Sequence, residues 1–428
     1  MNYPNGIHFP KDIMEEIREQ FLYVDYDKFI GKRLFFDNAG GSFRLKSVEK
    51  CFTEIDSIPD CPERSHKMAL YLQEIQKKGE EDIRIILNAP ESGSIVSALT
   101  ASQVIFQMVG AIAENVEGNN MVTTVLEHPS AFDAVSYYAQ KTGRELRVAD
   151  SNNETGGVDA DEIVSLIDEN TVLLSVMYAS NMTGAIYNME EIVKKARAKK
   201  PDLYIVCDSV QHTPHGVIDL KKMPVDAINF APYKFFGYRG SGFGYVSERV
   251  SKMPHHKLLG NKADVWELGS PAPAQYAAIT AIVDYVCRLG NKFISSNNRR
   301  SLFCEGMSRI KLHERSLLHT LLEGTEDVPG LRHIDGVKVL LDFHDLTKRD
   351  LILSIGFENI GYTEAVREYE KRNVIVYDRL ASSIYSRRML DSFGIDGAVR
   401  ISPLHCNTKE EMCEFLCITR DIAEHCKN

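Results

Sequence analysis

The chain has 428 residues, of which 44% are hydrophobic and 26% charged, so it can bury a large core in two or three domains. Its formal net charge of −10 argues against a broad nucleic-acid surface, and we expect no nucleic-acid partner. We also expect no membrane contact, because the chain has neither a signal-peptide pattern nor the roughly 18-residue apolar run that crosses a bilayer. Nine scattered cysteines without C-x-x-C spacing favour a reducing cytoplasm and predict neither a disulfide framework nor a zinc site.

The N-terminal part of the chain is predicted to lead into a turn. Residues 1–33 are interpreted as a helical arm, because apolar residues in KDIMEEIREQFLYV fall at helical spacing. RLFFDNAGGS (33–42) is predicted to be a strand that enters a turn rich in Asn and Gly. Residues 62–89 are mostly an amphipathic helix, and Arg64 and His66 stand just before its apolar periodicity begins.

A candidate phosphate site follows. Residues 95–99 are predicted to be a strand, which meets Thr100, Ala101 and Ser102 and then an apolar helix. The first N–H groups of a helix bind phosphate well, and a threonine hydroxyl adds a donor. Thr100 or Ser102 could also be the N-cap of the helix, because one residue can both cap a helix and bind phosphate.

The next segments continue as strands alternating with helices, which predicts an α/β fold. NMVTTVLEHPSAFDAV (120–135) is a strand, then His128, then a helix. ELRVADSN (145–152) and TVLLSVMYASNMTGAIYN (171–188) continue the alternation, and the second contains Asn181.

The central stretch holds the strongest chemical signal. LYIVC (203–207) and PVDAINF (224–230) are predicted to be buried strands; Asp208 ends the first, and Lys234 lies just beyond the second. Ligands bind beyond the carboxyl ends of strands in open α/β sheets, so both side chains would face a ligand. This pair suits pyridoxal 5'-phosphate: the lysine forms a Schiff base, and the carboxylate keeps the pyridinium nitrogen protonated. A helix-capping Asp and a solvated Lys are the alternative.

A change in composition near residue 291 predicts a second, α+β domain. We therefore expect a large domain of residues 34–290 and a small domain of residues 291–428. The strands predicted in the small domain are VKVLLDF (337–343), NVIVY (373–377) and GAVRIS (397–402). The helices predicted there lie at about 302–323, 347–355, 363–372 and 408–425.

Three spaced motifs carry a resemblance to a known family. FFDNAGGS (35–42), DSVQHTPHGVIDL (208–220) and APYKFFG (231–237) resemble the class V aminotransferase and cysteine desulfurase superfamily, and most its cysteine desulfurase-like branch. The resemblance runs from about residue 34 to the C-terminal helix. It implies fold type I of the pyridoxal-phosphate-dependent transferases, with a mostly parallel seven-stranded sheet in the large domain. It also implies a homodimer with shared active sites.

The resemblance further implies roles around the cofactor. Lys234, Asp208 and His128 would be the catalytic residues, and His128 would stack on the cofactor ring. Asn181 and Gln211 would hydrogen-bond its phenolic oxygen. The phosphate would be held by Thr100, Ala101, Ser102 and Tyr233, and by Ser270 reaching over from the partner subunit.

The same resemblance implies the substrate contacts. Arg400, in VRISPLHCNT (399–408), would grip the α-carboxylate in a bidentate manner. Backbone N–H groups of the turn at Asn38 and Ala39 could meet that carboxylate. Arg64 and His66 stand where family members place substrate-contacting residues. Each of these interpretations has an alternative. Arg400 could form a structural salt bridge, the segment at Asn38 and Ala39 could be an ordinary turn, and Arg64 and His66 could belong to a solvated charge cluster.

One departure from the family concerns the nucleophile. Desulfurases carry a reactive cysteine about 15 residues before the arginine, and here that position is Tyr385, within ASSIYSRRMLDSFG (381–394). No cysteine lies between Cys304 and Cys406. We therefore expect no persulfide chemistry on this loop, and Tyr385 becomes a candidate substrate contact.

These observations predict an enzyme that acts on an amino acid through a Cα carbanion, with Lys234 as the base. The favoured reaction is a desulfurase-like β-elimination without a catalytic cysteine. Transamination and epimerisation are the alternatives within enzymes. A catalytically idle, cofactor-binding scaffold protein is the alternative from another class, and the full set of predicted site residues argues against it.

Overall fold

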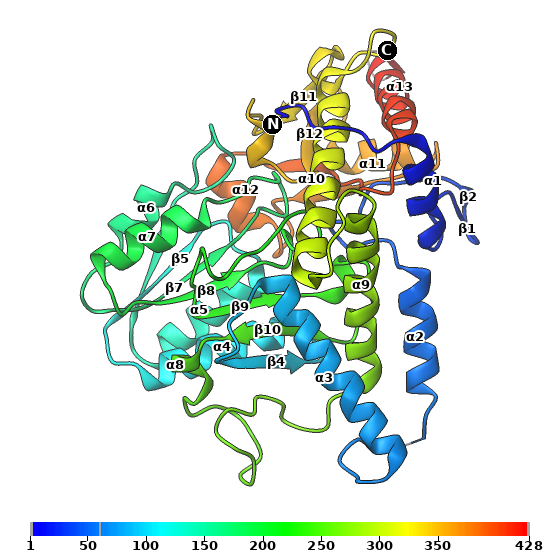
Figure 1. Cartoon of the computed structure of the whole chain (residues 1–428). Helices are drawn as coiled ribbons and strands as arrows, with labels where there is room; N and C mark the ends of the chain where they lie inside the picture. The colour runs from blue at the N-terminus through cyan, green and yellow to red at the C-terminus, as the bar shows by residue number, and fades with distance from the viewer. Residues whose placement is uncertain (1–2, 60, 426–428) are drawn as a thin grey trace.

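A seven-stranded sheet forms the centre of the large domain in the computed structural model, which describes residues 3–59 and 61–425 (Figure 1). Its strand order is β4-β10-β9-β8-β7-β5-β6. Strands β5 to β9 pair in parallel, whereas β10 is antiparallel to both of its neighbours. The predicted α/β fold class is confirmed. The strands are β4 (Ser94–Ala98), β5 (Asn120–Thr124), β6 (Glu145–Ala149), β7 (Thr171–Met177), β8 (Tyr204–Asp208), β9 (Ala227–Phe230) and β10 (Gly242–Val246).

Helices cover both faces of this sheet, which is why its central strands are continuous apolar runs. Successive strand residues alternate between the two layers: Val206 packs with the core under α4 and α5, and Ile205 and Cys207 pack with the opposite core. The first layer contains α4 (Ala101–Asn115), α5 (Pro129–Lys141) and α8 (Glu248–Ser251). The second contains α2 (Lys46–Asp56), α3 (Lys67–Leu87), α6 (Ala160–Ser165), α7 (Met189–Lys199) and α9 (Pro273–Asn291).

The small domain begins with the long helix α10 and contains a four-stranded antiparallel sheet with the order β11-β12-β15-β14. One face of this sheet packs against α11 and α13, where Val399 and Ile401 join the second core of the molecule. Its elements are α10 (Arg299–Glu323), β11 (Val337–Leu340), β12 (Leu353–Phe357), α11 (Tyr362–Glu370), β14 (Tyr377–Leu380), α12 (Arg387–Phe393), β15 (Gly397–Ile401) and α13 (Lys409–His425).

One prediction for the small domain is wrong, and another holds only in part. The helix predicted at 347–355 is a 3₁₀ turn, Leu346–Lys348, followed by β12, which is a central strand of the small sheet. A short apolar run such as LILSIGF fits a buried helix or a buried strand equally well, and pairing with β11 and β15 decides for the strand. The run NVIVY is divided between β13 (Val374–Ile375) and β14.

The N-terminal segment is helical only in part. Helix α1 (Lys11–Gln20) is followed by a hairpin of β1 (Tyr26–Asp27) and β2 (Gly31–Lys32), while residues 1–2 of the predicted arm lie outside the described residues. Strand β3 (Leu34–Phe35) then pairs in parallel with β13. The chain therefore touches the small domain at the point where the large domain was predicted to begin. The second predicted boundary, near residue 291, falls at the end of α9.

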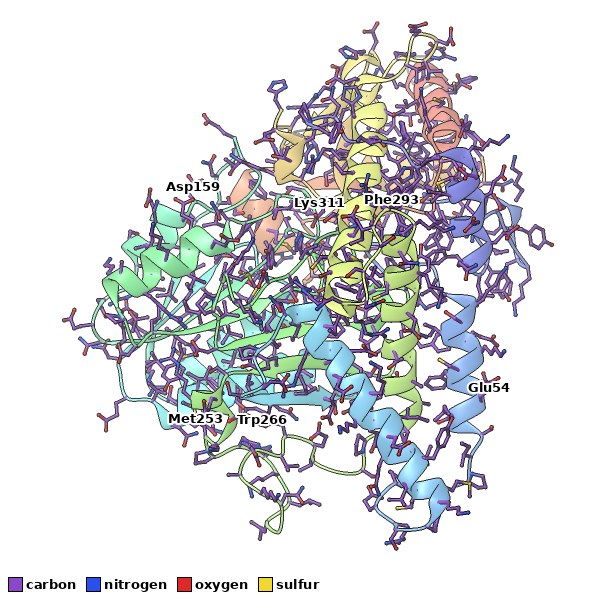
Figure 2. All side chains as sticks on the ribbon, in the orientation of Figure 1. Glu54, Asp159, Met253, Trp266, Phe293 and Lys311 are labelled. Atoms are coloured by element: carbon purple, nitrogen blue, oxygen red, sulfur yellow. The ribbon has the colours of Figure 1, made fainter. Side chains whose placement is uncertain are left out.

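The long connection between α8 and α9 is anchored by the only tryptophan. Trp266 is buried and packs in the same core as Met253, which follows α8 (Figure 2). Its ring stacks on His255 with centroids 4.1 Å apart, and its indole N–H donates to the Ser251 carbonyl at 3.0 Å. The stretch that carries Ser270 follows directly. Among the helices of residues 3–59 and 61–425, none combines the length and apolar character that a bilayer crossing requires.

Candidate active site

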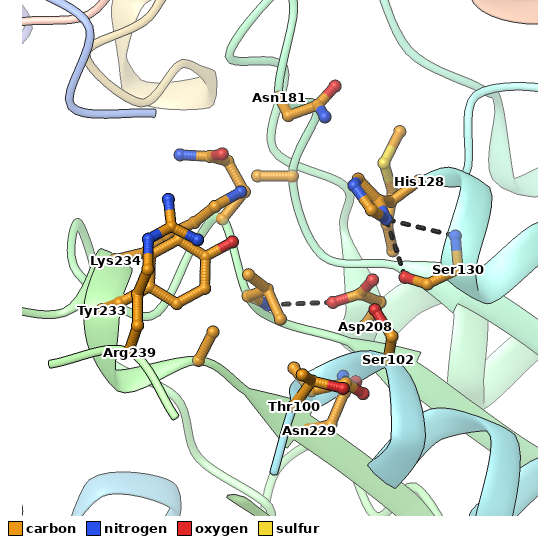
Figure 3. Close-up of a pocket in the computed structure, with 16 residues that line it drawn as sticks. Thr100, Ser102, His128, Ser130, Asn181, Asp208, Asn229, Tyr233, Lys234 and Arg239 are labelled. Carbon is orange, nitrogen blue, oxygen red and sulfur yellow. Dashed lines mark hydrogen bonds between the residues drawn. The ribbon is translucent and has the colours of Figure 1, made fainter. Parts of the chain in front are cut away.

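A cavity of about 260 Å³ lies at the carboxyl edge of the seven-stranded sheet, and it brings together most of the predicted cofactor residues (Figure 3). Strands β8 and β9 are parallel neighbours, so Asp208 and the loop carrying Lys234 leave the sheet on the same side, as predicted. The lining residues are Thr100, Ala101, Ser102, His128, Ser130, Met177, Ala179, Asn181, Asp208, Val210, Gln211, Asn229, Ala231, Tyr233, Lys234 and Arg239.

Lys234 presents a buried amine to this cavity, with its Nζ 6.0 Å from the centroid of the Tyr233 ring. It closes the 3₁₀ turn Pro232–Lys234, is 7% exposed, and its Nζ hydrogen-bonds to none of the described residues. Burial, helped by the positive charge of Arg400, lowers the pKa of Lys234 to about 8. A substantial fraction of this amine is therefore neutral and nucleophilic near physiological pH.

The turn that carries Lys234 is fixed from outside. Phe236 has a φ of +62°, a left-handed conformation that is costly for an aromatic residue. Its N–H donates to the Ser42 hydroxyl at 3.0 Å, and its ring packs edge-on against Phe21 and His405. The turn after β3 and the core thus hold the lysine loop in place.

Asp208 faces the cavity from the end of β8. Its Oδ1 accepts the Val210 N–H at 3.0 Å, and the residue is 6% exposed. Burial raises the pKa of the Asp208 carboxyl, while the Val210 N–H and the nearby Lys234 oppose the rise. A cationic hydrogen-bond donor placed in the cavity would stabilise the carboxylate form.

His128 caps α5 on the side of the cavity opposite Lys234 (Figure 3). Its Nδ1 accepts the Ser130 N–H at 3.2 Å and lies 2.7 Å from the Ser130 hydroxyl. Burial, together with the positive charge of Lys234, lowers the pKa of His128 to about 3. The ring is neutral at physiological pH and can stack on an aromatic ring without carrying charge.

The start of α4 forms the floor of the cavity. Thr100 is the N-cap and accepts the Gln103 N–H at 3.1 Å, and Ala101 and Ser102 follow at the open end of the helix. Strand β10 passes so close that a Cβ on Gly242 would lie 2.1 Å from the Ala101 nitrogen. The helix start is thereby held against the sheet with its first N–H groups available to an anion.

These residues fit pyridoxal phosphate. The side-chain amides of Asn181 and Gln211 hydrogen-bond to none of the described residues, and each has a buried oxygen without a partner. A buried amide in that state points to a missing ligand. Together with the Lys234 amine, the Asp208 carboxyl and the helix start, the cavity offers a partner for an aldehyde, a ring nitrogen, a phenolic oxygen and a phosphate.

Arg400 lies beside the cavity and is hydrogen-bonded to Asn181, which lines it. Its Nη1 donates to the Asn181 carbonyl at 3.2 Å, and its Nη2 donates to the Asp37 carboxylate at 2.6 Å. The Arg400 Nε is buried and has no partner. The predicted substrate-binding arginine is thus held next to the site, and it also forms the structural ion pair that was the alternative.

The turn at Asn38 and Ala39, whose backbone N–H groups were predicted to meet the substrate, is bound to the small domain, and its contact with substrate stays a prediction. The backbone N–H of Asn38 donates to the Ser402 carbonyl at 3.0 Å, and that of Ala39 donates to the Ser402 hydroxyl at 3.1 Å. The Asn38 side chain donates to the carbonyls of Phe35 and Ser402 and accepts the Phe43 N–H. These hydrogen bonds of Asn38 and Ala39 hold the turn against the end of β15. The structure gives both residues a role in holding the turn.

Four further predicted residues do not line the cavity. His66 caps α3, accepting the Ala69 N–H at 3.3 Å, and Arg64 is exposed just before it. Ser270 is exposed and hydrogen-bonds to Glu63, so it shares a surface with the start of α3. Tyr385 is 58% exposed. Its carbonyl accepts from Arg379 at 3.1 Å, and its backbone N–H donates to the Ser383 hydroxyl at 3.3 Å.

Sequence reasoning missed several residues of the site. Ser130 and Asn229 line the cavity, and the Arg239 guanidinium stacks over the Tyr233 ring at 4.0 Å from its centroid. Arg379 is buried near the cavity, and its charge contributes to the lowered pKa values of both His128 and Lys234. The sequence around Arg239 matches no motif that assigns this arginine a role, and Arg379 lies within β14 without any local motif around it.

Comparison with known proteins identifies the family. Residues 34–415 match the family model described as aminotransferase class-V, and the chain belongs to this family. It is 25% identical over 420 residues to a probable cysteine desulfurase of Synechocystis sp., covering 94% of this chain and 93% of that protein. It is 31% identical over 228 residues to probable cysteine desulfurase 2 of Mycobacterium leprae, covering 52% of this chain and 50% of that protein.

Solved structures agree on the fold. The apo structure of cysteine desulfurase from Thermococcus onnurineus NA1 superposes with a TM-score of 0.80 at 20% identity, covering 96% of this chain and 98% of that one. The cysteine desulfurase CsdA from Escherichia coli gives a TM-score of 0.78 at 18% identity with the same coverage. The chain is a pyridoxal-phosphate-dependent enzyme of the class V aminotransferase family, with fold type I and pyridoxal phosphate as its cofactor.

Proposed function

We propose that this enzyme is a lyase that breaks a bond at Cβ of an amino acid without using a cysteine nucleophile. The observation that carries the proposal is the content of the Lys234 cavity: it holds a buried amine and a buried carboxyl, and no described cysteine lines it. The cysteine desulfurase names of the relatives support a reaction at Cβ.

Each cavity residue has a defined task in such a reaction. The bound cofactor supplies an electron sink for a carbanion at Cα. Lys234 Nζ, with its lowered pKa, takes the proton from Cα and holds it. The Asp208 carboxylate would keep a proton on the ring nitrogen, and the His128 ring, which is neutral, would cover one face of the cofactor and exclude water. The N–H groups at the start of α4 bind the phosphate.

The cysteines near the site in sequence are poor nucleophiles. Cys406 follows the strand that carries Arg400, but it is fully buried in the main core. Burial raises the pKa of its thiol well above the usual value, so the thiolate does not form. Tyr385 occupies the loop position of the family nucleophile, and a phenol cannot form a persulfide. Direct elimination needs only a base and a leaving group.

We further propose a homodimer in which Arg64, His66 and Ser270 serve the partner's site. The hydrogen bond between Ser270 and Glu63 puts these residues on one surface of the subunit. The groove beside Ser270 is also lined by Leu99 and Leu268, which are 71% and 55% exposed. Exposed leucines in a groove favour coverage by another protein surface, and a second copy would bring the three polar residues to a cavity they do not reach within their own chain.

Reductive trapping tests the core of the proposal. Borohydride treatment of the cofactor-loaded protein should fix the cofactor covalently to Lys234, as read by peptide mapping. Lys234→Ala should abolish the label, and Lys221→Ala, which changes an exposed lysine of the same stretch, should leave it unchanged. A label on another lysine, or none, contradicts the site assignment.

The reaction itself is tested with a panel of amino acids. Cofactor absorbance should change on mixing, and a lyase should release ammonia and a keto acid, with sulfide when the leaving group is a thiol. Conversion to a keto acid with stoichiometric amination of the cofactor would establish transamination instead. Inversion at Cα would establish epimerisation, and unchanged absorbance with the whole panel would indicate an idle, cofactor-binding protein.

A further inference from the structure

Two arginines share one face of the small sheet. On the antiparallel pair β14 and β15, Arg379 lies opposite Ala398, and Arg400 lies opposite Tyr377. Directly opposed residues point to the same side of a sheet, so Arg379 and Arg400 are diagonal neighbours, with backbones on the order of 7–8 Å apart. Ser354, paired with Arg400 on β12, donates from this face to the Met182 carbonyl of the large domain at 2.8 Å. The face therefore looks toward the cavity side of the large domain.

Arg379 is buried there without an anion. It is 7% exposed, its Nη2 donates to the Tyr385 carbonyl at 3.1 Å, and its buried Nε has no partner. Arg400, by contrast, is paired with Asp37. Among residues 3–59 and 61–425, no carboxylate forms an ion pair with Arg379. A buried guanidinium in this state is costly unless a ligand supplies the missing charge.

The charged groups around the cavity also show an excess of positive charge. Burial and the neighbouring Arg400 lower the pKa of Arg379 to about 10, which still leaves it charged at physiological pH. Glu127, which lies directly before His128, is fully buried, and burial raises its pKa to about 8, so it supplies little negative charge. Asp37 forms its ion pair with Arg400, and its charge is the weakest of the influences on the pKa of Arg379. Asp208 would be needed for the ring nitrogen of the cofactor.

We infer that Arg379 binds a second anionic group, carried on the side chain of the substrate, and that the substrate class is amino acids with acidic side chains. The inference rests on the proposed function, because Arg400 must take the α-carboxylate for Arg379 to be left for the side chain. The unpartnered Nε atoms of the two arginines then receive the two anionic ends of one ligand.

Isosteric pairs that differ in charge test this subsite. Cofactor-loaded protein is titrated with L-aspartate and L-asparagine, and with L-glutamate and L-glutamine, and the cofactor absorbance is followed. The acidic member of at least one pair should bind about tenfold more tightly or better. Arg379→Gln should abolish this preference while changing the affinity for the amide member by less than about threefold. Arg379→Lys should retain part of the preference.

Arg387→Gln is the matched control, because Arg387 donates to the Ala381 carbonyl on the same loop but is exposed. It should leave the preference unchanged. Equal binding of both members of each pair by the wild type would overturn the subsite. An equal loss for both members in Arg379→Gln would also overturn it, because the arginine would then serve the α-carboxylate or the loop.

A second measurement separates failure of the subsite from failure of the proposed function. Succinate and butyrate carry two and one carboxylates and need no reaction with the cofactor. Succinate should raise the Tm of the wild type more than butyrate does, and Arg379→Gln should remove the difference. If no amino acid changes the absorbance but succinate is preferred, the proposed function fails and the anion subsite stands. If succinate and butyrate act alike, the subsite is refuted.

Discussion

Arg400 of β15 and Asp37 of the turn after β3 form an ion pair with an Nη2 to Oδ1 distance of 2.6 Å. The pair joins the small sheet to the turn that holds the lysine loop. It also places a carboxylate of the protein on the guanidinium that was predicted to grip the substrate. A ligand carboxylate that binds side-on, through Nε and Nη2, must therefore displace Asp37.

Asp37→Asn should tighten the binding of α-carboxylate ligands. The competing anion is gone, and we expect an affinity gain of several-fold, about 1 kcal/mol. The same change leaves the buried Arg400 without a counterion, so the free energy of unfolding of the ligand-free protein should fall by about 1–3 kcal/mol. Titration with an amino acid and chemical denaturation measure the two effects.

Asp27→Asn is a suitable control for this prediction. Asp27 pairs with Arg33, which is also buried, at 3.3 Å, and neither residue lines the cavity. Its loss should lower stability without changing ligand affinity. Weaker carboxylate binding in Asp37→Asn would show that Asp37 orients Arg400 and does not compete with the ligand.

The reactivity of Lys234 should follow its lowered pKa. In the cofactor-free protein the side chain is mostly ammonium below pH 8 and mostly amine above it, because its pKa is about 8. The rate of labelling by an amine-selective reagent should rise through a midpoint near pH 8 at Lys234, and at higher pH at exposed lysines. Labelling followed by peptide mapping provides the measurement. A midpoint near 10 would mean that the site is more solvated than the structure indicates.

Asp208→Asn should retain the cofactor and lose most of the activity. A neutral amide cannot hold a proton on the ring nitrogen, and we expect turnover to fall on the order of 100-fold or more. Asp150→Asn is the matched control, since Asp150 follows β6 at the same edge of the sheet but is exposed. Near-normal turnover in Asp208→Asn, with the cofactor absorbance intact, would assign this carboxylate another task.

Removing Cys406 should have little effect on catalysis. Cys406→Ser, and Cys406→Ala to avoid burying a hydroxyl, should keep turnover on the best amino acid of the panel within about tenfold, roughly 1.4 kcal/mol of barrier. The reason is that the thiol is fully buried in the core and protonated. Loss of several orders of magnitude with fold and cofactor intact would reveal a relocated nucleophile and refute a lyase without a cysteine.

Shared active sites predict complementation between subunits. Inactive Lys234→Ala chains mixed with Ser270→Ala chains should form hybrid dimers in which one site has an intact Lys234 and an intact Ser270 from the other chain. Activity should rise above the sum of the separate variants, as measured after co-refolding. Simple additivity, or a monomer by sedimentation at assay concentration, would contradict the shared site.

Local chemistry in the sequence predicted the cofactor side of the site well. Asp208 and Lys234 end or follow apolar runs, and parallel strands necessarily deliver such residues to one edge of the sheet. Thr100 was predicted both to begin a helix and to bind phosphate, and the structure confirms the first of these roles. The helix predicted at 347–355 failed because a short buried run carries no periodicity that separates a strand from a helix.

The sequence by itself thus determined the α/β class, most of the large-domain strands along the chain, and the placing of Asp208 and Lys234 at one edge of the sheet, because these follow from apolar runs and their neighbours. Only the tertiary structure decided the substrate side. Arg379 and Arg400 become neighbours through the register of two strands. Asp37 forms an ion pair with Arg400, although the two residues are 363 positions apart in the sequence. Such contacts depend on how distant segments are packed together, and no local pattern encodes the distance between them.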